Sequence, residues 1–518
     1  MSEESIVMEL SKPVVQYPNR TRQYVLLGIF ALTMFIDVLA ASAFFVFTGA
    51  VSRDLEIPFA QQSWVITSYA VTFASFLVFW GKNAELLGPK TIFCPAFFCV
   101  GVLSLVISFI TNRYAFFVLR GIAGVAAAAL VPTAYRLIGI AFPLEKRSKA
   151  YTLYGMTGSI ANVTGTIIAG VVALIPRDQG VQMVEWRWFF RIVAVLAIVL
   201  TLTFRIAGAL ISFWIIPKDA KPDGINRQTW KRLDVPGLVM LQCAIILFIT
   251  GLTLGASYGW GRATFLAPFL IAIVLFPLFF WRESRIPYDN ALIPSALWRL
   301  PNFLVLVLLS LLTLGWWSVM FLPFIETFHD VHGETYLLSA LRTLPIGVSA
   351  GFISVVLVLY PSIIARPKWP IVISLTLSSV AYVLFTQAPS VVGKTYWSYL
   401  LPGMLIGSAG MQVVLLSTNV GLVLAAPPEM SGLVGAVYQT GLQTSSVIAL
   451  SIQAGLLTTF EGGIQNLKNL RASFYFELGW TVLWLIGFTL LYRSSKEPHR
   501  SKTLDGEGKE NLEVPLHV

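Results

Sequence analysis

The feature that most constrains this chain is a series of long apolar segments with very few charges. A helix needs roughly 20 mostly apolar residues to cross a bilayer. Because only helices and closed barrels can cross lipid, the series predicts an all-α membrane protein of about fourteen spans. The spans are expected near 24–47, 61–80, 91–111, 114–142, 150–175, 188–216, 235–256, 264–281, 303–325, 336–360, 370–388, 396–426, 432–458 and 473–492. The pair at 235–256 and 264–281 is the least distinct.

Composition agrees with lipid as the surrounding solvent. Of the 518 residues, 56% are hydrophobic and only 12% are charged, whereas soluble domains have roughly 25% charged residues. The net charge of +10 does not indicate nucleic-acid binding, because Lys and Arg lie mainly in short loops and form no basic face with interleaved aromatic residues. The three cysteines (Cys94, Cys99 and Cys243) fall in apolar segments without the spacing of a disulfide framework or a zinc site.

Loop charges predict the orientation and the division of the chain. When both tails are placed in the cytoplasm, the inner loops hold a clear excess of Lys and Arg, as the positive-inside rule requires. We expect an integral protein of the plasma membrane or the vacuolar membrane. Its predicted parts are an N-terminal tail (1–23), a six-helix bundle (24–216), an inserted helix pair with flanking loops (217–302), a second six-helix bundle (303–492) and a C-terminal tail (493–518).

Several short motifs have the spacing of a known transporter family. The loop after the second span reads GKNAELLGPK at 81–90, and Arg120 is followed four residues later by Gly124 in the fourth span. The fifth span contains ANVTGTIIAG at 161–170, the sixth starts with WRW at 186–188, and LDVPG at 233–237 precedes the inserted pair. With these motifs the chain resembles the major facilitator superfamily, and within it the fourteen-helix drug:proton antiporter branch found in fungi, over roughly residues 24 to 492.

The resemblance implies a major facilitator fold with two six-helix halves and an inserted pair. It also implies that the loop after the second span acts as a conformational latch, carried here by Gly81, Glu85, Gly88 and Lys90. The family's arginines are missing from this loop. In the fifth span Thr166 stands where the antiporter motif has proline, so the direction of transport is left open.

Charged groups within spans are costly and mark functional sites. Asp37 lies in the first span and Arg120 in the fourth, at depths that a long guanidinium side chain can bridge. A carboxylate beside an arginine in a low-dielectric cavity can exchange a proton for a ligand, so we assign proton coupling to this pair. The alternative is a permanently ionised pair that only fixes helix packing.

Uncharged polar residues and one further arginine form a second group. Gln439 and Gln443 lie one helical turn apart on one face, and Gln412 and Asn419 also share a face. Arg342 is a candidate for an anionic group, with an outer-end latch to Glu326 or Asp330 as the alternative. For the others the alternative is interhelical hydrogen bonding. The predicted substrate-binding residues are Tyr69, Asn162, Arg342, Gln412, Asn419, Gln439 and Gln443.

The sequence gives little support for enzymatic activity or metal binding. No paired carboxylates or Ser-His-Asp arrangement is present, and no GxxxxGK[ST] sequence indicates nucleotide binding. His329 and His332 form an HxxH pair without further ligands. We therefore predict no catalytic residues, no metal and no cofactor.

The predicted function is secondary active transport of a small organic solute (a drug, toxin or secreted metabolite) by alternating access, with protons as the exchanged partner. A proton-independent facilitator, a symporter and a non-transporting solute sensor remain alternatives. We expect contact with membrane lipid, no nucleic-acid partner, and action as a monomer.

Overall fold

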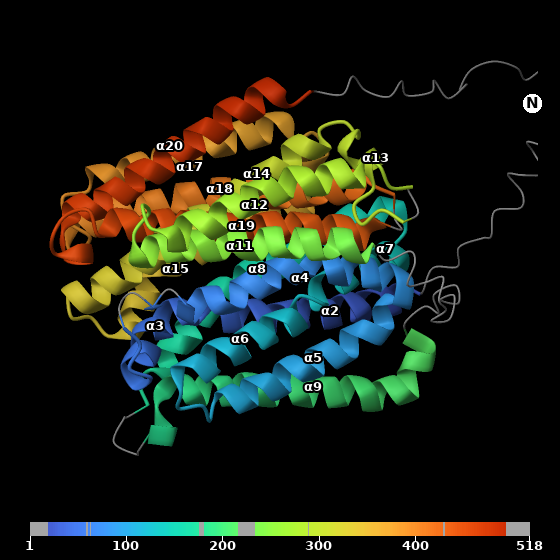
Figure 1. Ribbon diagram of the computed structural model, residues 1–518, viewed down its shortest axis with the longest axis horizontal. Coiled ribbons are helices and arrows are strands. Elements are labelled where there is room, and N and C mark those ends of the chain that lie inside the picture. The colour runs from blue at the N-terminus through green and yellow to red at the C-terminus, as the bar shows by residue number, and fades with distance from the viewer. Residues whose placement is uncertain are drawn as a thin grey trace, which may run out of the picture.

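The computed structural model describes residues 19–58, 61–62, 64–175, 181–215, 234–287, 290–427 and 430–493. Across these ranges the chain is helical and has no strand, which confirms the predicted all-α fold. The helices run side by side through the molecule, and α2 begins at the same face at which α20 ends (Figure 1). We call this face the terminal face and the other the distal face.

The N-terminal half comprises the helices up to residue 215. They are α2 (Arg20–Ser42), α3 (Phe44–Asp54), α4 (Trp64–Leu87), α5 (Pro89–Ile107), α6 (Arg113–Ala127), α7 (Leu130–Ala141), α8 (Leu144–Val172), the 3-10 turn η2 (Val181–Met183) and α9 (Glu185–Ile215). The inserted pair follows as α11 (Val235–Tyr258) and α12 (Ala263–Glu283), with the short α13 (Ser295–Trp298) after it.

The C-terminal half starts at residue 303. Its elements are α14 (Phe303–Glu326), the π-helical turn η3 (Thr327–Val331), α15 (Tyr336–Leu359), α16 (Ser362–Ala365), α17 (Lys368–Gln387), the π-helical turn η4 (Tyr396–Leu400), α18 (Leu401–Ala425), α19 (Ser431–Leu457), the 3-10 turn η6 (Gly463–Gln465) and α20 (Leu467–Leu491).

In the described ranges, eleven helices are long and apolar enough to cross a membrane. The helices α5, α9 and α19 lie where three more spans were predicted, and they contain 19, 31 and 27 residues. The helical segments therefore follow the predicted spans in order along the chain. This agrees with fourteen crossings, and the number itself stays a prediction.

The two halves meet along two seams. α4 packs against α19, and α8 packs against α15. In Figure 1 the blue-green N-terminal half and the yellow-red C-terminal half lie on opposite sides of these contacts. Small residues permit the close approach: a Cβ placed on Gly81 of α4 would lie 3.1 Å from the Cβ of Ala436 on α19. Small residues are a general means of bringing membrane helices together.

Local sequence explains two details of the N-terminal half. The fourth span is interrupted at Ala128 and Ala129, between α6 and α7. Pro132 lies four residues after Ala128. Because proline has no amide hydrogen, it cannot donate the helical hydrogen bond to the Ala128 carbonyl, and its ring crowds that carbonyl. At the distal face, the Arg187 guanidinium of the WRW motif donates to Asp54 Oδ2 at 2.9 Å, and the Trp186 indole donates to the same oxygen at 3.0 Å. This motif therefore ties α9 to the end of α3.

The inserted pair lies against one seam. α11 contacts both α4 and α19 as well as its partner α12. Asp234, at the start of α11, forms an ion pair with Arg282 near the end of α12. The Lys82 ammonium of α4 donates to the Ala291 carbonyl at 3.1 Å. The pair is thus fixed to both halves of the molecule.

Candidate functional site

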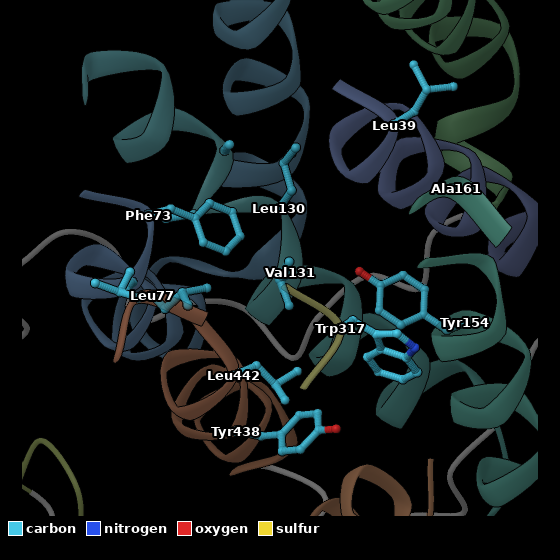
Figure 2. Close-up of a cluster of buried hydrophobic side chains, with 14 of the residues drawn as sticks. Leu39, Phe73, Leu77, Leu130, Val131, Tyr154, Ala161, Trp317, Tyr438 and Leu442 are labelled. Atoms are coloured by element: carbon cyan, nitrogen blue, oxygen red, sulfur yellow. The ribbon is translucent and has the colours of Figure 1, made fainter. Parts of the chain in front are cut away.

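A cavity of about 180 Å³ lies between the two halves. Its lining comes from α2, α3, α4, α6, α7 and α8 on one side and from α14, α15, α18 and α19 on the other. Figure 2 shows part of its apolar wall, with Phe73 and Val131 from the N-terminal half and Trp317, Tyr438 and Leu442 from the C-terminal half. Seven of the nine residues predicted for coupling and substrate binding line this cavity: Asp37, Tyr69, Arg120, Asn162, Asn419, Gln439 and Gln443.

The charged part of the cavity is built by three helices of the N-terminal half. The Tyr69 hydroxyl on α4 donates to Asp37 Oδ1 on α2 at 2.5 Å. The Arg120 guanidinium on α6 lies over the rings of Phe44 and Tyr69, 4.0 and 4.8 Å from their centroids. Asp37 and Arg120 are only 7% and 4% exposed. Tyr69 therefore contacts both of the charged residues that the sequence predicted as a pair, and within the described ranges no carboxylate comes within 4.0 Å of Arg120.

The C-terminal half contributes amides and an apolar wall. Asn419 Oδ1 on α18 accepts from the Tyr135 hydroxyl on α7 at 2.9 Å. Gln439 and Gln443 of α19 line the cavity one turn apart, as their spacing predicted. Asn162 on α8 faces them from the N-terminal half, and its Oδ1 is buried without a partner among the described residues. The amides thus supply hydrogen-bonding groups on both sides of the cavity.

Two predicted residues lie outside the cavity. Arg342 on α15 forms an ion pair with Glu334 rather than with Glu326 or Asp330, and its Nε donates to that carboxylate at 2.7 Å. Gln412 on α18 is fully buried between Ser159 of the N-terminal half and Ser354 of α15. The sequence pattern could not give the rotation of either residue about its helix axis.

The predicted latch segment lies at the terminal face. Glu85 is 3.7 Å from the Lys82 ammonium within α4. Gly88 has a φ of 83° where the chain turns into α5, a conformation that favours glycine. Gly81 contacts α19 as described above, and the side chain of Lys90 lies outside the described part of the structure. The segment thus adjoins the contact between the halves.

The halves also contact each other on both sides of the cavity. Toward the terminal face, Tyr135 bonds to Asn419, and a Cβ on Gly435 of α19 would lie 2.6 Å from the Tyr135 ring. Toward the distal face, the Arg53 guanidinium of α3 donates to the Tyr336 hydroxyl of α15 at 3.1 Å. We call these contacts the terminal gate and the distal gate.

Part of the chain is similar to a known protein family. The family model described as Major Facilitator Superfamily matches residues 30–258, which hold the Asp37–Tyr69–Arg120 group and α11. Over this segment the chain is similar to the major facilitator superfamily. Solved structures support the same fold at low sequence identity. A bacterial homologue of the human drug peptide transporters has a TM-score of 0.60 at 14% identity, covering 91% of this chain and 97% of that one. The proton:xylose symporter XylE has a TM-score of 0.57 at 11% identity, covering 92% and 100%.

Several curated proteins that are similar to this chain are named as transporters or export proteins. The low affinity ammonium transporter of Saccharomyces cerevisiae is 25% identical over 81% of this chain and 78% of its own length. The multidrug transporter mfsC of Aspergillus fumigatus is 23% identical over 88% and 84%. The tetracenomycin C resistance and export protein of Streptomyces glaucescens is 26% identical over 80% and 72%. These names support the drug-transporter branch that the motifs indicated.

Tyr135, whose hydroxyl bonds to Asn419 across the two halves, was not among the residues predicted from the sequence. Tyr135 stacks on Tyr151 with 5.6 Å between centroids and meets Tyr154 edge-on at 5.4 Å. The available signal was the presence of Tyr135, Tyr151 and Tyr154 in the adjacent spans 114–142 and 150–175. In the described ranges, no group of three or more His, Cys, Asp or Glu residues is placed to hold a metal ion. His329 instead stacks on Tyr336 at 3.7 Å.

Proposed function

We propose that this protein moves a small organic solute across its membrane by alternating access, in exchange for protons. The observation that carries the proposal is the cavity between the halves, with a buried carboxylate in its wall and contacts between the halves on either side. Ligand sites at the interface of repeated halves are general in secondary transporters. Opening the terminal gate or the distal gate in turn would expose the cavity to one face at a time.

Asp37 is the group we assign to carry the proton. It lines the cavity, and its only hydrogen-bond partner in the described structure is the Tyr69 hydroxyl. A solute group that donates a hydrogen bond to Asp37 would occupy the same carboxylate as the proton, so the two would exclude each other. Exchange requires this mutual exclusion, because the proton must leave Asp37 before the solute binds, and the solute must leave before the proton returns.

The relatives' names favour export as the direction, since several describe multidrug transport, resistance and efflux. We propose the plasma membrane, with the vacuolar membrane as the alternative. The terminal face is cytoplasmic in this proposal, because the basic loops adjoin it. The protein is proposed to act as a monomer and to have no nucleic-acid partner. The domain boundaries predicted from the sequence are retained as part of this proposal.

One observation favours a second candidate, a facilitator or symporter. Thr166 replaces the proline of the antiporter motif, and its hydroxyl donates to the Val163 carbonyl at 2.8 Å. Helix α8 runs from Leu144 to Val172 without a break. A proline at position 166 would remove one backbone hydrogen bond from this helix.

The test is solute-driven proton movement into proteoliposomes that contain a pH dye, across a panel of weak acids, weak bases and amphipathic drugs. We expect at least one solute to move protons in the opposite direction in the wild type, and the Asp37→Asn variant to lose this movement while still exchanging labelled solute. Asp330→Asn, at a half-exposed position of the distal face, is the matched control. Solute transport that ignores both the pH gradient and Asp37 would establish the facilitator instead.

A further inference from the structure

The separation of the two buried charges indicates which solutes the cavity selects. Building on the proposed function, we infer that it takes uncharged aromatic solutes bearing a hydroxyl or carboxamide group, which bridges Asp37 and Arg120. Such a group donates its hydrogen to the carboxylate and accepts from the guanidinium. The charges face the same cavity but do not touch, so the space between them suits a group that is both donor and acceptor.

Asp37 offers one free acceptor to the cavity. Its Oδ1 is used by the Tyr69 hydroxyl, while Oδ2 makes no hydrogen bond to the described part of the chain. Oδ2 is also absent from the buried atoms that lack partners, and the side chain lines the cavity. A carboxylate oxygen in a largely apolar wall gains most from a ligand that donates to it.

Arg120 offers free donors to the same cavity. Its guanidinium is held by the rings of Phe44 and Tyr69, which attract its charge but accept no conventional hydrogen bond. None of its nitrogens bonds to a described residue, and Nε is buried without a partner. Five donors with no acceptor among the described residues, on a side chain that is 4% exposed, form a site that a ligand acceptor completes.

The balance of charge disfavours ionised solutes. With Asp37 ionised, one negative and one positive group share the cavity. An anion attracted to Arg120 would therefore approach Asp37, and a cation attracted to Asp37 would approach Arg120. Either ligand also loses its hydration on entering an apolar cavity, which is far more costly for an ion than for a hydroxyl or an amide. An uncharged head group satisfies both residues without adding a third charge.

The remaining wall fits an aromatic body. Phe45 of α3 and Phe321 of α14 stack across the two halves with 5.9 Å between centroids, and both line the cavity. Trp317 lines it beside them, with its indole nitrogen donating to Ser408 at 3.1 Å and so held in place. Flat rings can therefore lie against aromatic faces contributed by both halves.

The experiment compares probes that share one ring system and differ in the head group. They are 2-naphthol, 2-methoxynaphthalene, 2-naphthoate and 2-naphthylmethylammonium, measured by equilibrium binding to purified protein in detergent at pH 7.5. We expect 2-naphthol to bind at least about tenfold tighter than the methoxy compound, since hydrogen bonds to charged groups carry roughly that factor or more. We expect both ions to bind more weakly than 2-naphthol.

Variants then assign the preference to residues. In Asp37→Asn the advantage of 2-naphthol over 2-methoxynaphthalene should fall below about threefold, because the charge-assisted bond that only the hydroxyl can donate is lost. In Arg120→Gln both probes should bind more weakly and the advantage should remain, because the hydroxyl oxygen and the ether oxygen can each accept from the guanidinium. Thermal unfolding of each variant in the same detergent checks that it is folded. Arg285→Gln, at an exposed arginine beside Trp281 near the end of α12, is the matched control and should keep the full preference.

Three outcomes would overturn the inference. Tightest binding of 2-naphthoate would make Arg120 an anion site, and tightest binding of the ammonium compound would make Asp37 a cation site. Equal binding of 2-naphthol and its methyl ether would show that no bridging group is recognised. Because the binding experiment does not depend on transport, its result can refute the solute preference without refuting the proposed transport function. Proton movement driven only by charged solutes refutes the inference alone, whereas the expected binding order without any solute-driven proton movement refutes the transport proposal alone.

Discussion

Replacing Gly435 by alanine should shift this transporter toward conformations open at the terminal face. Gly435 lies on α19 at the terminal gate, and a Cβ there would sit 2.6 Å from Cγ, 2.7 Å from Cδ2 and 3.1 Å from Cβ of Tyr135. These atoms belong to the root of a ring stacked on Tyr151, which limits how far it can move. The clash exists only while α7 and α19 are in contact, so opening the gate relieves it.

The size of the shift follows from the cost of overpacking. One extra carbon in a well-packed contact costs about 1–3 kcal/mol. Since RT is about 0.59 kcal/mol, this corresponds to an equilibrium shift of about 5- to 150-fold toward the open gate. A similar clash within one half has a different consequence. A Cβ on Gly407 of α18 would lie 2.5 Å from Ala381 and 2.6 Å from Trp316, and no rigid-body motion of the halves relieves that contact.

The assay is the rate at which a membrane-impermeant maleimide labels a cysteine placed at Leu415, which lines the cavity. The three native cysteines are first replaced by serine, and the reagent is added to the terminal face of oriented proteoliposomes. Gly435→Ala should label at least about fivefold faster than the parent, with little change in unfolding temperature. Gly407→Ala should leave labelling unchanged and lower the unfolding temperature. Equal labelling in all three proteins would refute the gate assignment, as would a loss of stability in Gly435→Ala that matches Gly407→Ala.

Two further predictions concern stability. Arg187→Gln should lower the free energy of unfolding by about 3–5 kcal/mol, because it leaves the Asp54 carboxylate without its buried partner. Unfolding in mixed detergent micelles measures this loss. A loss below about 1 kcal/mol would contradict the structural role of the ion pair. Gly165→Ala should cost about 1–3 kcal/mol, because its Cβ would lie 2.6 Å from the Leu39 carbonyl, whereas Gly121→Ala meets only an ordinary 3.6 Å contact and should be neutral. Thermal unfolding of both variants compares them, and equal stability would contradict the close packing of α2 on α8.

Much of the fold was predictable because length and polarity determine which segments cross a bilayer. Even the least distinct pair, expected at 235–256 and 264–281, agrees within a few residues with α11 (Val235–Tyr258) and α12 (Ala263–Glu283). The residues that line the central cavity were harder to predict from the sequence than the membrane-spanning segments. Depth along the helices was enough to group Asp37 with Arg120, and a one-turn spacing was enough to place Gln439 beside Gln443.

Rotation about the helix axis could not be predicted from a single sequence. Trp316 and Trp317 are adjacent, yet Trp317 lines the cavity while Trp316 packs against Tyr382 with 5.2 Å between centroids. The same limitation applies to Arg342, whose partner Glu334 lies in the connection before α15. Both cases depend on tertiary packing, which a hydropathy pattern of highly apolar helices does not encode.

Because of the inserted pair, the two seams of the molecule differ in how directly they contact lipid. Along the α4–α19 seam, a bilayer molecule meets α11 and α12 before it can reach either half. Along the α8–α15 seam it meets the protein directly, at side chains such as Val348 and Phe352, which are 58% and 67% exposed. The surroundings of the two seams therefore differ at the periphery. Solutes dissolved in the membrane encounter a shielded side and an open side, and any lateral route into the cavity has one available edge.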